Sequence, residues 1–456
     1  MRMVSRNPYT GQINGEFETI KLEDAAAQIE KTRQAFYSWK RKGIGERAGF
    51  LKNAAGILRQ GKEEWAKKIT LEMGKPIEQS RGEIEKCAAV CDFFADNAEK
   101  FLEAERIPTE AAKSYVRFDP LGVVLGIMPW NFPFWQVFRF AVPALMAGNA
   151  CVLKHASNVP MTAVAIENVF SRAGFPEHVF KTLLADSQTA MQVIEKELVD
   201  AVSLTGSVEA GAQVASLAGR HIKKVVLELG GSDPFIVLED ADISKTAAMA
   251  IQGRMINSGQ SCIASKRFIV MASREREFTD ALQDELASLK VGDPMDPKTN
   301  IGPLAKREFV EGLTEQLEDA ARKGGRVIEG PAPPEGPGFF FRPVVVADAK
   351  PEMRVVAEEV FGPIMPILSE QTEEDVIRTA NRTIFGLGAS IWTRDLNRAE
   401  RMAGELDAGF VAINDTVKSD ARLPFGGIKK SGLGRELSHY GLKEFTNLKT
   451  VVVRGA

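Results

Sequence analysis

The sequence predicts an α/β protein built from parallel βαβ units. Between Leu121 and Gly206, short apolar runs such as GVVLGIM and ACVLK alternate with segments of helical periodicity such as WQVFRFAVPALMAG. A second alternating region follows the glycine pair in VVLELGGSDPFIVL. Continuous apolar runs are typical of strands that helices cover on both faces, as in parallel sheets with right-handed crossovers.

The other elements follow in chain order. Residues 24 to 105 have the spacing of amphipathic helices, which predicts a helical N-terminal layer. In the first alternating region, FKTLL and AVSLTG are expected strands, and a helix is expected from Met161 to Ala173. The expected strands of the second region are RFIVM, RVIEG, RPVVV and MPILSE. The glycine pair interrupts two apolar strands and predicts a domain boundary near Gly230.

Composition narrows the class of protein. The chain has 456 residues and a net charge of -3 with both signs interspersed, which argues against a nucleic-acid or anionic-lipid surface. The polar N-terminus lacks the apolar segment of a secretion signal. The most apolar run is broken by prolines and contains Arg139, so we expect it to be buried in the protein rather than in a membrane. Four scattered cysteines do not suggest a disulfide framework, and we expect a reducing compartment, the cytoplasm.

Three of the cysteines have an ordinary structural interpretation. Cys87 and Cys91 are four residues apart on a predicted helix, and Cys151 lies in an apolar strand, so burial is expected for all three and no metal site is predicted. Cys262 differs, because it lies between NSGQS and IASKR, a polar segment from which a thiol can reach a cleft. Cys262 is therefore the candidate nucleophile.

Neither a GxGxxG fingerprint nor a Walker loop follows any predicted strand. The segment GSVEAG, from Gly206 to Gly211, follows the strand AVSLT and could open a helix whose first amides receive a diphosphate. A plain helix start capped by Ser207 or Thr205 explains the same segment equally well.

Five separated motifs together resemble the aldehyde dehydrogenase superfamily, in its order and approximate spacing. They are PWNFP (129–133), LELGG (227–231), GQSC (259–262), EEVFGP (358–363) and PFGGIKKSGLGRE (424–436). The resemblance covers essentially the whole chain. It implies a Rossmann-type cofactor domain, an α/β catalytic domain and a small β oligomerisation flap. The expected ranges are 1–113 and 132–229 for the cofactor domain, 230–426 for the catalytic domain, and 114–131 and 427–456 for the oligomerisation segments.

The resemblance also implies the chemistry. Cys262 would add to an aldehyde as thiolate, and Asn131 with the Cys262 backbone N–H would stabilise the oxyanion. After hydride transfer to a nicotinamide, Glu228 would activate the water that hydrolyses the thioester.

A cofactor site without the glycine fingerprint is a further implication. Lys154 would contact the adenosine ribose, Ser207 the diphosphate, and Glu359 with Phe361 the nicotinamide ribose. The full expected set is Trp130, Lys154, Ser157, Gly206, Ser207, Gly211, Glu359 and Phe361. Ser157 replaces a glutamate that would repel a 2′-phosphate, so NADP is favoured and NAD is a second cofactor. His155 replaces the family's commoner proline.

Within the family, LKHASN and GGIKKSGLGRELSHYG resemble the short bacterial succinate-semialdehyde dehydrogenase branch. An aldehyde acid needs a cation for its distal carboxylate. Arg139 shares a helix face with Gln136 and is the expected cation, with Ser419 as hydrogen-bond donor. The alternative is that Arg139 pairs with a structural carboxylate.

Several alternatives remain open at this point. The substrate could be another small aldehyde, such as glutarate semialdehyde or a hydroxyaldehyde, or coenzyme A could replace water. A catalytically retired binding or structural protein on the same fold is a different class. A short-chain dehydrogenase is excluded, because no tyrosine begins a YxxxK motif. The position two residues after Cys262 is Ala264, so a disulfide lock used by some relatives is unavailable. The expected partners are a small aldehyde and further copies of the chain, as a homodimer or homotetramer, with no nucleic acid or membrane.

Overall fold

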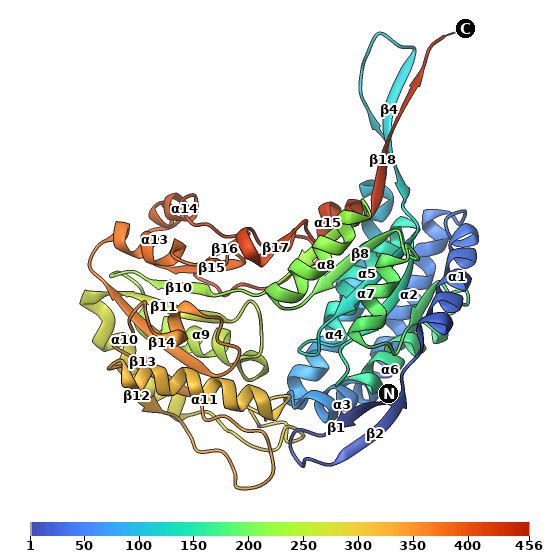
Figure 1. The fold of residues 1–456 in the computed structure, drawn as a ribbon. Helices are drawn as coiled ribbons and strands as arrows, with labels where there is room; N and C mark the ends of the chain where they lie inside the picture. The colour runs from blue at the N-terminus through green and yellow to red at the C-terminus, as the bar shows by residue number, and fades with distance from the viewer. Residues whose placement is uncertain (1, 456) are drawn as a thin grey trace.

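The computed structural model describes residues 2–455 and contains two α/β bodies, from one of which a narrow β arm projects (Figure 1). The first body is built on a six-stranded sheet of order β17-β9-β8-β5-β6-β7, parallel except at β17. Its strands are β5 (Val123–Met128), β6 (Ala150–His155), β7 (Phe180–Thr182), β8 (Ala201–Thr205), β9 (Lys224–Glu228) and β17 (Gly432–Leu433). The predicted parallel α/β class is confirmed.

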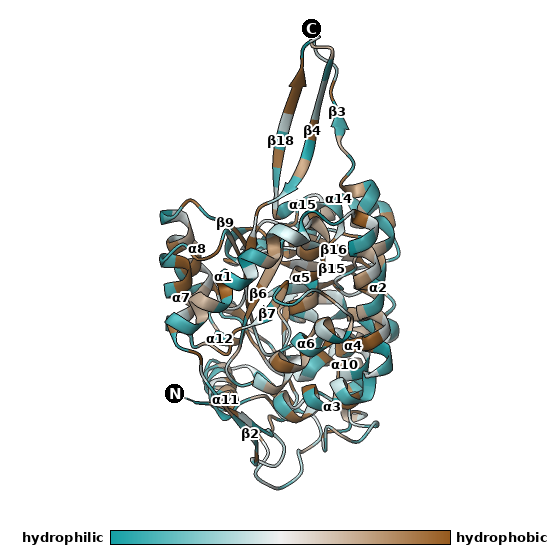
Figure 2. Ribbon diagram, turned by 90° about the vertical axis from the view of Figure 1, so that its right-hand side faces the viewer, coloured by the Kyte–Doolittle hydropathy of each residue, from teal (hydrophilic) through white to brown (hydrophobic). Residues whose placement is uncertain are grey.

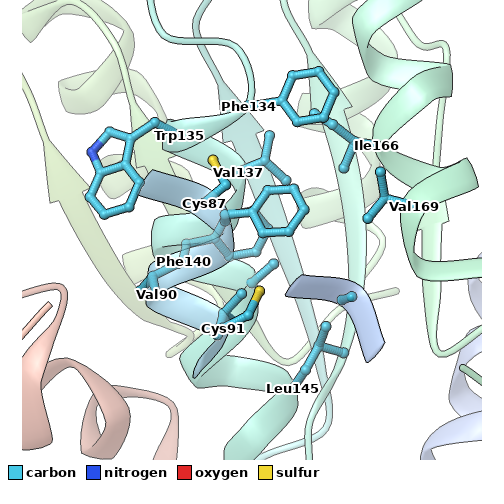
Figure 3. Close-up of a cluster of buried hydrophobic side chains, with 14 of the residues drawn as sticks. Cys87, Val90, Cys91, Phe134, Trp135, Val137, Phe140, Leu145, Ile166 and Val169 are labelled. Atoms are coloured by element: carbon cyan, nitrogen blue, oxygen red, sulfur yellow. The ribbon is translucent and has the colours of Figure 1, made fainter. Parts of the chain in front are cut away.

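Helices cover both faces of this sheet, because successive strand residues point to opposite sides and both sides are apolar. On β5, Val124 packs with the core that contains the helical residues 48–98, whereas Val123 and Leu125 pack with the opposite core, which contains Ala25 and Ile29 of the first helix. The helices are α1 (Leu22–Trp39), α2 (Ile44–Gln60), α3 (Lys62–Met73), α4 (Ile77–Phe101), α5 (Trp135–Ala147), α6 (Pro160–Arg172), α7 (Ser187–Glu195), α8 (Val208–Arg220) and α15 (Ser438–Glu444). Figure 3 shows the thiols of Cys87 and Cys91, both fully buried, between α4 and α5.

The order of the strands shows where a ligand site is expected in the first body. The chain runs outward from β5 to β6 and β7, then returns to the other side of β5 with β8 and β9. Ligands of open α/β sheets bind at the carboxyl ends of the strands, beside such a reversal. PWNFP follows β5, KHAS ends β6 and GSVEAG follows β8, so all three motifs lie at this edge.

The second body has a seven-stranded sheet of order β12-β13-β14-β11-β10-β15-β16. Its strands are β10 (Asp233–Val237), β11 (Ser265–Met271), β12 (Arg326–Glu329), β13 (Val344–Ala347), β14 (Ile364–Glu370), β15 (Gly388–Trp392) and β16 (Phe410–Ile413). Its helices are α9 (Ile243–Met255), α10 (Glu275–Ala287), α11 (Arg307–Arg322), α12 (Arg354–Ala357), α13 (Glu373–Asn381) and α14 (Leu396–Ala403). Gly230 lies between β9 of one sheet and β10 of the other, where the domain boundary was predicted. The sequence analysis did not predict β15, β16 or the N-terminal hairpin of β1 (Arg2–Arg6) and β2 (Ile13–Glu18).

The arm is a three-stranded antiparallel sheet of β18 (Thr446–Val453), β4 (Lys113–Pro120) and β3 (Glu105–Arg106). Figure 2 shows it standing clear of the body with apolar residues on β18, and Leu448 and Val452 are exposed. The predicted segment 114–131 was too long, because β5 is apolar on both faces and lies in the six-stranded sheet. The predicted segment 427–456 was also too long, since β17 pairs with β9 and α15 packs on α5.

Membrane spans were examined on the same structure. Within residues 2–455, no helix combines the length and the apolar character that a span requires.

The close packing of α5 on β5 can be tested by its contribution to the stability of the protein. An added Cβ at Gly126 would overlap the buried ring of Phe140, and the flat ring has little room to move. We expect Gly126→Ala to destabilise the protein by about 1–3 kcal/mol, the usual cost of overpacking. Thermal unfolding by circular dichroism measures the effect. Gly49→Ala is the matched control, because a Cβ at Gly49 of α2 would meet no atom within 4 Å and helical alanine is favoured over glycine. Equal melting temperatures for Gly126→Ala and the wild type would contradict the packing argument.

Candidate active site

Cys262 lies in the turn that joins α9 to β11, at the interface of the two bodies. The turn contains Asn257 and Ser258 in the left-handed region, with φ of 53° and 56°. At Gly259, where φ is 80°, a Cβ would overlap the backbone of Gly362. The GQSC motif therefore packs directly against the EEVFGP motif, and glycine permits the close approach.

Hydrogen bonds join this turn to the PWNFP segment. Asn257 Nδ2 donates to the Asn131 carbonyl at 2.7 Å, and Asn131 Nδ2 donates to the Gln260 carbonyl at 3.1 Å. Gln79 of α4 accepts the backbone N–H of Asn257 at 2.6 Å. The side-chain amide of Asn131 and the thiol of Cys262 are thus carried by two segments that are fixed relative to each other.

Cys262 lines a mainly apolar cavity of about 300 Å³. The exposed surface of the wall is mainly apolar, although eight of the sixteen residues that line the cavity are polar or charged. The wall includes the side chains of Lys86, Phe132, Trp135, Gln136, Arg139, Ser419 and Phe425. A small aldehyde fits such a cavity, since ligand sites combine apolar walls with a few placed polar groups.

The thiol of Cys262 is held mainly in its neutral form. Burial raises the pKa of Cys262 to about 11, although the positive charges of Arg139 and Lys266 oppose the shift. Lys266 is buried, donates to the Cys262 carbonyl at 2.6 Å and pairs with Glu359 at 3.2 Å. Without a ligand, only a small fraction of Cys262 is the reactive thiolate at neutral pH.

Glu228, at the end of β9, is the carboxylate predicted as general base. Its side chain is 2% exposed, and neither oxygen has a hydrogen-bond partner among the described residues. Burial and the neighbouring Glu436 hold the pKa of Glu228 well above its usual range, while Arg139 acts in the opposite direction. Glu228 also raises the pKa of Cys262, so its carboxylate lies within electrostatic range of the thiol.

Arg139 has a carboxylate partner within the protein, which is the alternative stated in the sequence analysis. Its Nε forms a buried ion pair with Glu436, and its Nη2 donates to Thr205 Oγ1 at 3.3 Å. The guanidinium carbon lies 4.7 Å from the centre of the Phe425 ring. Arg139 lines the cavity beside Gln136, but its charge is already balanced by Glu436.

Lys86 is a cavity cation that the sequence analysis missed. Its Nζ donates to Ser419 Oγ at 2.6 Å and lies 4.2 Å from the centre of the Trp135 ring. The available signal was the helical spacing of Gln79, Glu83 and Lys86, which puts three polar side chains on one face of α4.

Glu83 fixes α4 against the segment that carries the site. Its Oε1 accepts the backbone N–H groups of Phe134 and Trp135, each at 2.9 Å, where α5 begins. Its other oxygen forms a buried ion pair with Lys75. A carboxylate at a helix N-terminus is favourable, since it accepts hydrogen bonds from amides that have no partner within the helix.

A second cavity, of about 540 Å³, lies at the carboxyl end of β6. Its wall includes Lys154, Ser157 and Asn158 from one body and Lys306 and Arg307 from the other. Burial lowers the pKa of Lys154, Asp186 opposes this shift, and the nearby cation Lys306 adds to it. Clustered cations with a nearby serine hydroxyl fit the phosphorylated ribose of a dinucleotide.

The GSVEAG segment begins α8. Both a diphosphate-binding helix start and a plain capped helix start predicted this. Ser207 Oγ accepts the Ala210 N–H at 3.2 Å, so Ser207 is the helix cap. Gly206 precedes the cap, and its amide donates to the Glu228 carbonyl at 3.0 Å. A Cβ at Gly211 would clash with Leu229, so that glycine serves the close packing of helix on strand.

Glu359, Phe361 and Trp130 lie together near Cys262. Glu359 Oε1 accepts the Gly231 N–H at 3.1 Å, and the Trp130 ring lies edge-on to Phe361 with centres 5.8 Å apart. Arg254 of α9 holds their segment through a 3.0 Å hydrogen bond to the Val360 carbonyl. None of these three side chains lines the Lys154 cavity.

A thiol at a cavity, a nearby side-chain amide and a buried carboxyl fit the oxidation of an aldehyde. The chain belongs to the aldehyde dehydrogenase family, which matches residues 1–451.

Individual relatives narrow the comparison. The chain is 46% identical over 451 residues to a probable succinate-semialdehyde dehydrogenase [NADP(+)] of Synechocystis sp., covering 99% of both chains. It is 43% identical to a succinate-semialdehyde dehydrogenase [NADP(+)] of Deinococcus radiodurans, covering 98% of this chain and 93% of the relative. The crystal structure of succinic semialdehyde dehydrogenase from Streptococcus pyogenes with NADP+ superposes with a TM-score of 0.96 at 34% identity, covering 99% and 100% of the two chains.

The raised thiol pKa predicts how the ligand-free protein reacts with iodoacetamide. Because the pKa of Cys262 is about 11, the labelling rate should rise about tenfold per pH unit between pH 7 and 10. Mass spectrometry of tryptic peptides measures the rate at Cys262. Cys87, Cys91 and Cys151 are the internal controls, since all three are buried and their pKa values are raised. A labelling rate that reaches its plateau below pH 9 would show a thiolate far more stabilised than this geometry supports.

Proposed function

We propose that the protein oxidises succinate semialdehyde to succinate, with NADP as the preferred hydride acceptor. The observation that supports this substrate is the wall of the Cys262 cavity, where Lys86 supplies a positive charge and Lys86 and Ser419 supply hydrogen-bond donors. A short aldehyde with a carboxylate at its other end matches both features. The names of the Synechocystis and Deinococcus relatives support the same substrate.

In the proposed reaction, the Cys262 thiolate adds to the aldehyde carbonyl, and a C–S bond forms as the oxygen takes up negative charge. Asn131 Nδ2 and the Cys262 backbone N–H donate to that oxygen. Asn131 is suited to this role because its amide is already oriented by the Gln260 carbonyl and has a second N–H to offer. Bound NADP supplies the acceptor for the hydride that leaves the same carbon.

Glu228 serves the hydrolysis of the resulting thioester. Its carboxylate takes a proton from a water molecule, whose oxygen attacks the thioester carbonyl and releases the Cys262 thiolate. The raised pKa of Glu228 makes it a stronger base than an exposed glutamate, so the proton moves to it more readily. The nearby charge of Arg139 keeps the ionised form accessible.

The cofactor preference rests on the cavity at the end of β6. We propose that Lys154 contacts the adenosine ribose and that Ser157 leaves room for its 2′-phosphate. Lys306 and Arg307 face this position from the other body and add positive charge. Toward the nicotinamide end, we assign Ser207 and Gly206 to the diphosphate and Glu359, Phe361 and Trp130 to the nicotinamide ribose, with Gly211 holding α8 in place.

We also propose that the arm joins copies of this chain as a dimer or a dimer of dimers. Its exposed apolar residues, Leu448, Val452 and Val453, stand away from the body on the edge strand β18. An exposed apolar edge strand favours pairing with another chain.

Four free thiols fit a reducing compartment, and we place the enzyme in the cytoplasm.

The test is the initial rate of nicotinamide reduction with succinate semialdehyde and with butyraldehyde, each with NADP and with NAD. We expect the highest kcat/KM for succinate semialdehyde with NADP, and no turnover by Cys262→Ala. Glutarate semialdehyde is the third aldehyde to compare. Equal use of butyraldehyde would refute the acid substrate, and faster turnover of glutarate semialdehyde would reassign it.

Ser157→Glu tests the 2′-phosphate position separately. A carboxylate there would repel the phosphate, so KM for NADP should rise about a hundredfold while KM for NAD changes much less. Steady-state kinetics with both cofactors measure the change. Ser157→Ala is the matched control, since it removes the hydroxyl without adding charge. If Ser157→Glu weakened both cofactors equally, the phosphate would lie elsewhere.

A further inference from the structure

Lys86 carries a positive charge that the protein itself does not balance. Its Nζ donates to the neutral hydroxyl of Ser419 and faces the Trp135 ring, and the ion pairs of residues 2–455 leave it without an acidic partner. Burial of such an ammonium is costly, because it loses water and gains no counter-ion. The burial lowers its pKa to about 8.

The other charges around the cavity are already paired. Arg139 pairs with Glu436, Lys418 with Asp415, and Glu83 with Lys75. An anionic ligand that enters the cavity therefore gains most from Lys86, the cation of the described wall residues that lacks a carboxylate partner.

We propose that Lys86 is a specificity-determining residue that binds the distal carboxylate of the aldehyde substrate together with Ser419. This inference rests on the proposed function and adds a residue to it. The ammonium donates to one side of the Ser419 oxygen, so the hydroxyl hydrogen of Ser419 is free to donate to the same carboxylate. Charge-assisted hydrogen bonds of this kind are shorter and stronger than neutral ones.

The position of Lys86 also orients the substrate. Lys86, Trp135 and Ser419 line both the Cys262 cavity and an outer groove of about 320 Å³. Lys86 is thus at the outer part of the cavity. A carboxylate held there stays near the solvent, while the aldehyde at the other end of the molecule points inward to Cys262.

The arrangement is rigid enough to select by charge. Glu83 lies nearly one helical turn before Lys86 and fixes α4 on the start of α5 through the Phe134 and Trp135 amides. The backbone of Lys86 is therefore held beside the cavity by a buried network. A neutral aldehyde leaves its ammonium unpaired, whereas an acid aldehyde balances it.

The test is Lys86→Met, which keeps the length of the side chain and removes the charge. We expect the ratio of kcat/KM for succinate semialdehyde to that for butyraldehyde to fall about 10- to 100-fold, mainly through KM for the acid. Lys86→Arg should restore most of the ratio. Lys100→Met is the matched control, because Lys100 is exposed on the same helix, away from the cavity.

A pH profile provides a second readout that a purely structural role would not give. The charged and titratable groups that act on Lys86 are Glu83 and Cys87 of α4, Arg139 of α5 and Asp420 of the loop after β16. As pH rises through about 8, Lys86 loses its proton, so KM for the acid aldehyde should rise in the wild type. Lys86→Met should lack this rise. Titration of Cys262 and Glu228 changes the turnover of both aldehydes, so its effect cancels in the ratio of kcat/KM for succinate semialdehyde to that for butyraldehyde.

The outcomes separate the two proposals. A wild type that prefers the acid aldehyde, with the preference unchanged in Lys86→Met, overturns the role of Lys86 and leaves the proposed function standing. A wild type with no preference overturns both. A lost preference in Lys86→Met that Lys86→Arg restores supports both, and butyraldehyde turnover by each variant shows that it has folded.

Discussion

The hydrogen bonds between the PWNFP segment and the turn at Asn257 to Gln260 are the constraint on which the site depends. Asn131 belongs to the body with the six-stranded sheet, and Cys262 belongs to the other. The buried bonds from Asn257 to the Asn131 carbonyl and from Asn131 to the Gln260 carbonyl join the two across the interface. A shift of either body would separate the thiol from the amide, and misplacement by about 1 Å is costly in catalysis.

The site also depends on charged groups that are buried around Cys262. Around Cys262, the protein buries two carboxyl groups, Glu228 and Glu436, and two cations, Arg139 and Lys266. Each cation has a carboxylate partner, Glu436 for Arg139 and Glu359 for Lys266. The thiol and the base are consequently kept mainly in their neutral forms by burial, and the reactive forms depend on the fields of these cations. The same low-dielectric surroundings strengthen any hydrogen bond to a developing oxyanion.

Much of the fold could be predicted from sequence, because the parallel strands are apolar on both faces and glycines mark their ends. The strand β15 was missed because it begins with small residues whose burial depends on neighbouring strands, and β16 was missed because most of its residues are only half-buried. The predicted boundary of the oligomerisation segment 114–131 was wrong at β5. There β4 of the arm continues after a two-residue turn into a strand of a different sheet. Local pattern does not show which sheet a strand joins.

The site residues, too, could be predicted from the sequence only in part. Residues within motifs, such as Cys262 and Asn131, could be named from sequence because each motif fixes a local turn. The partners of charged groups could not, because they come from distant parts of the chain: Glu436 lies 297 positions beyond Arg139, and Ser419 lies 333 positions beyond Lys86. The expected cation Arg139 and the missed cation Lys86 line one cavity, and only the tertiary structure shows which of them has a carboxylate partner.

This difference bears on how an acid substrate is selected. An arginine that is paired with a buried glutamate contributes a dipole more than a net charge, so its attraction for an incoming anion falls off quickly with distance. A lysine without a carboxylate in direct contact keeps more of its field, although Glu83 and Asp420 weaken it. Its position between the outer groove and the cavity lets that field act on the ligand before it reaches the thiol. The two cations are therefore suited to different tasks. Arg139 tunes Cys262 and Glu228, whose pKa values both respond to it, and Lys86 distinguishes acid from neutral aldehydes at the entrance.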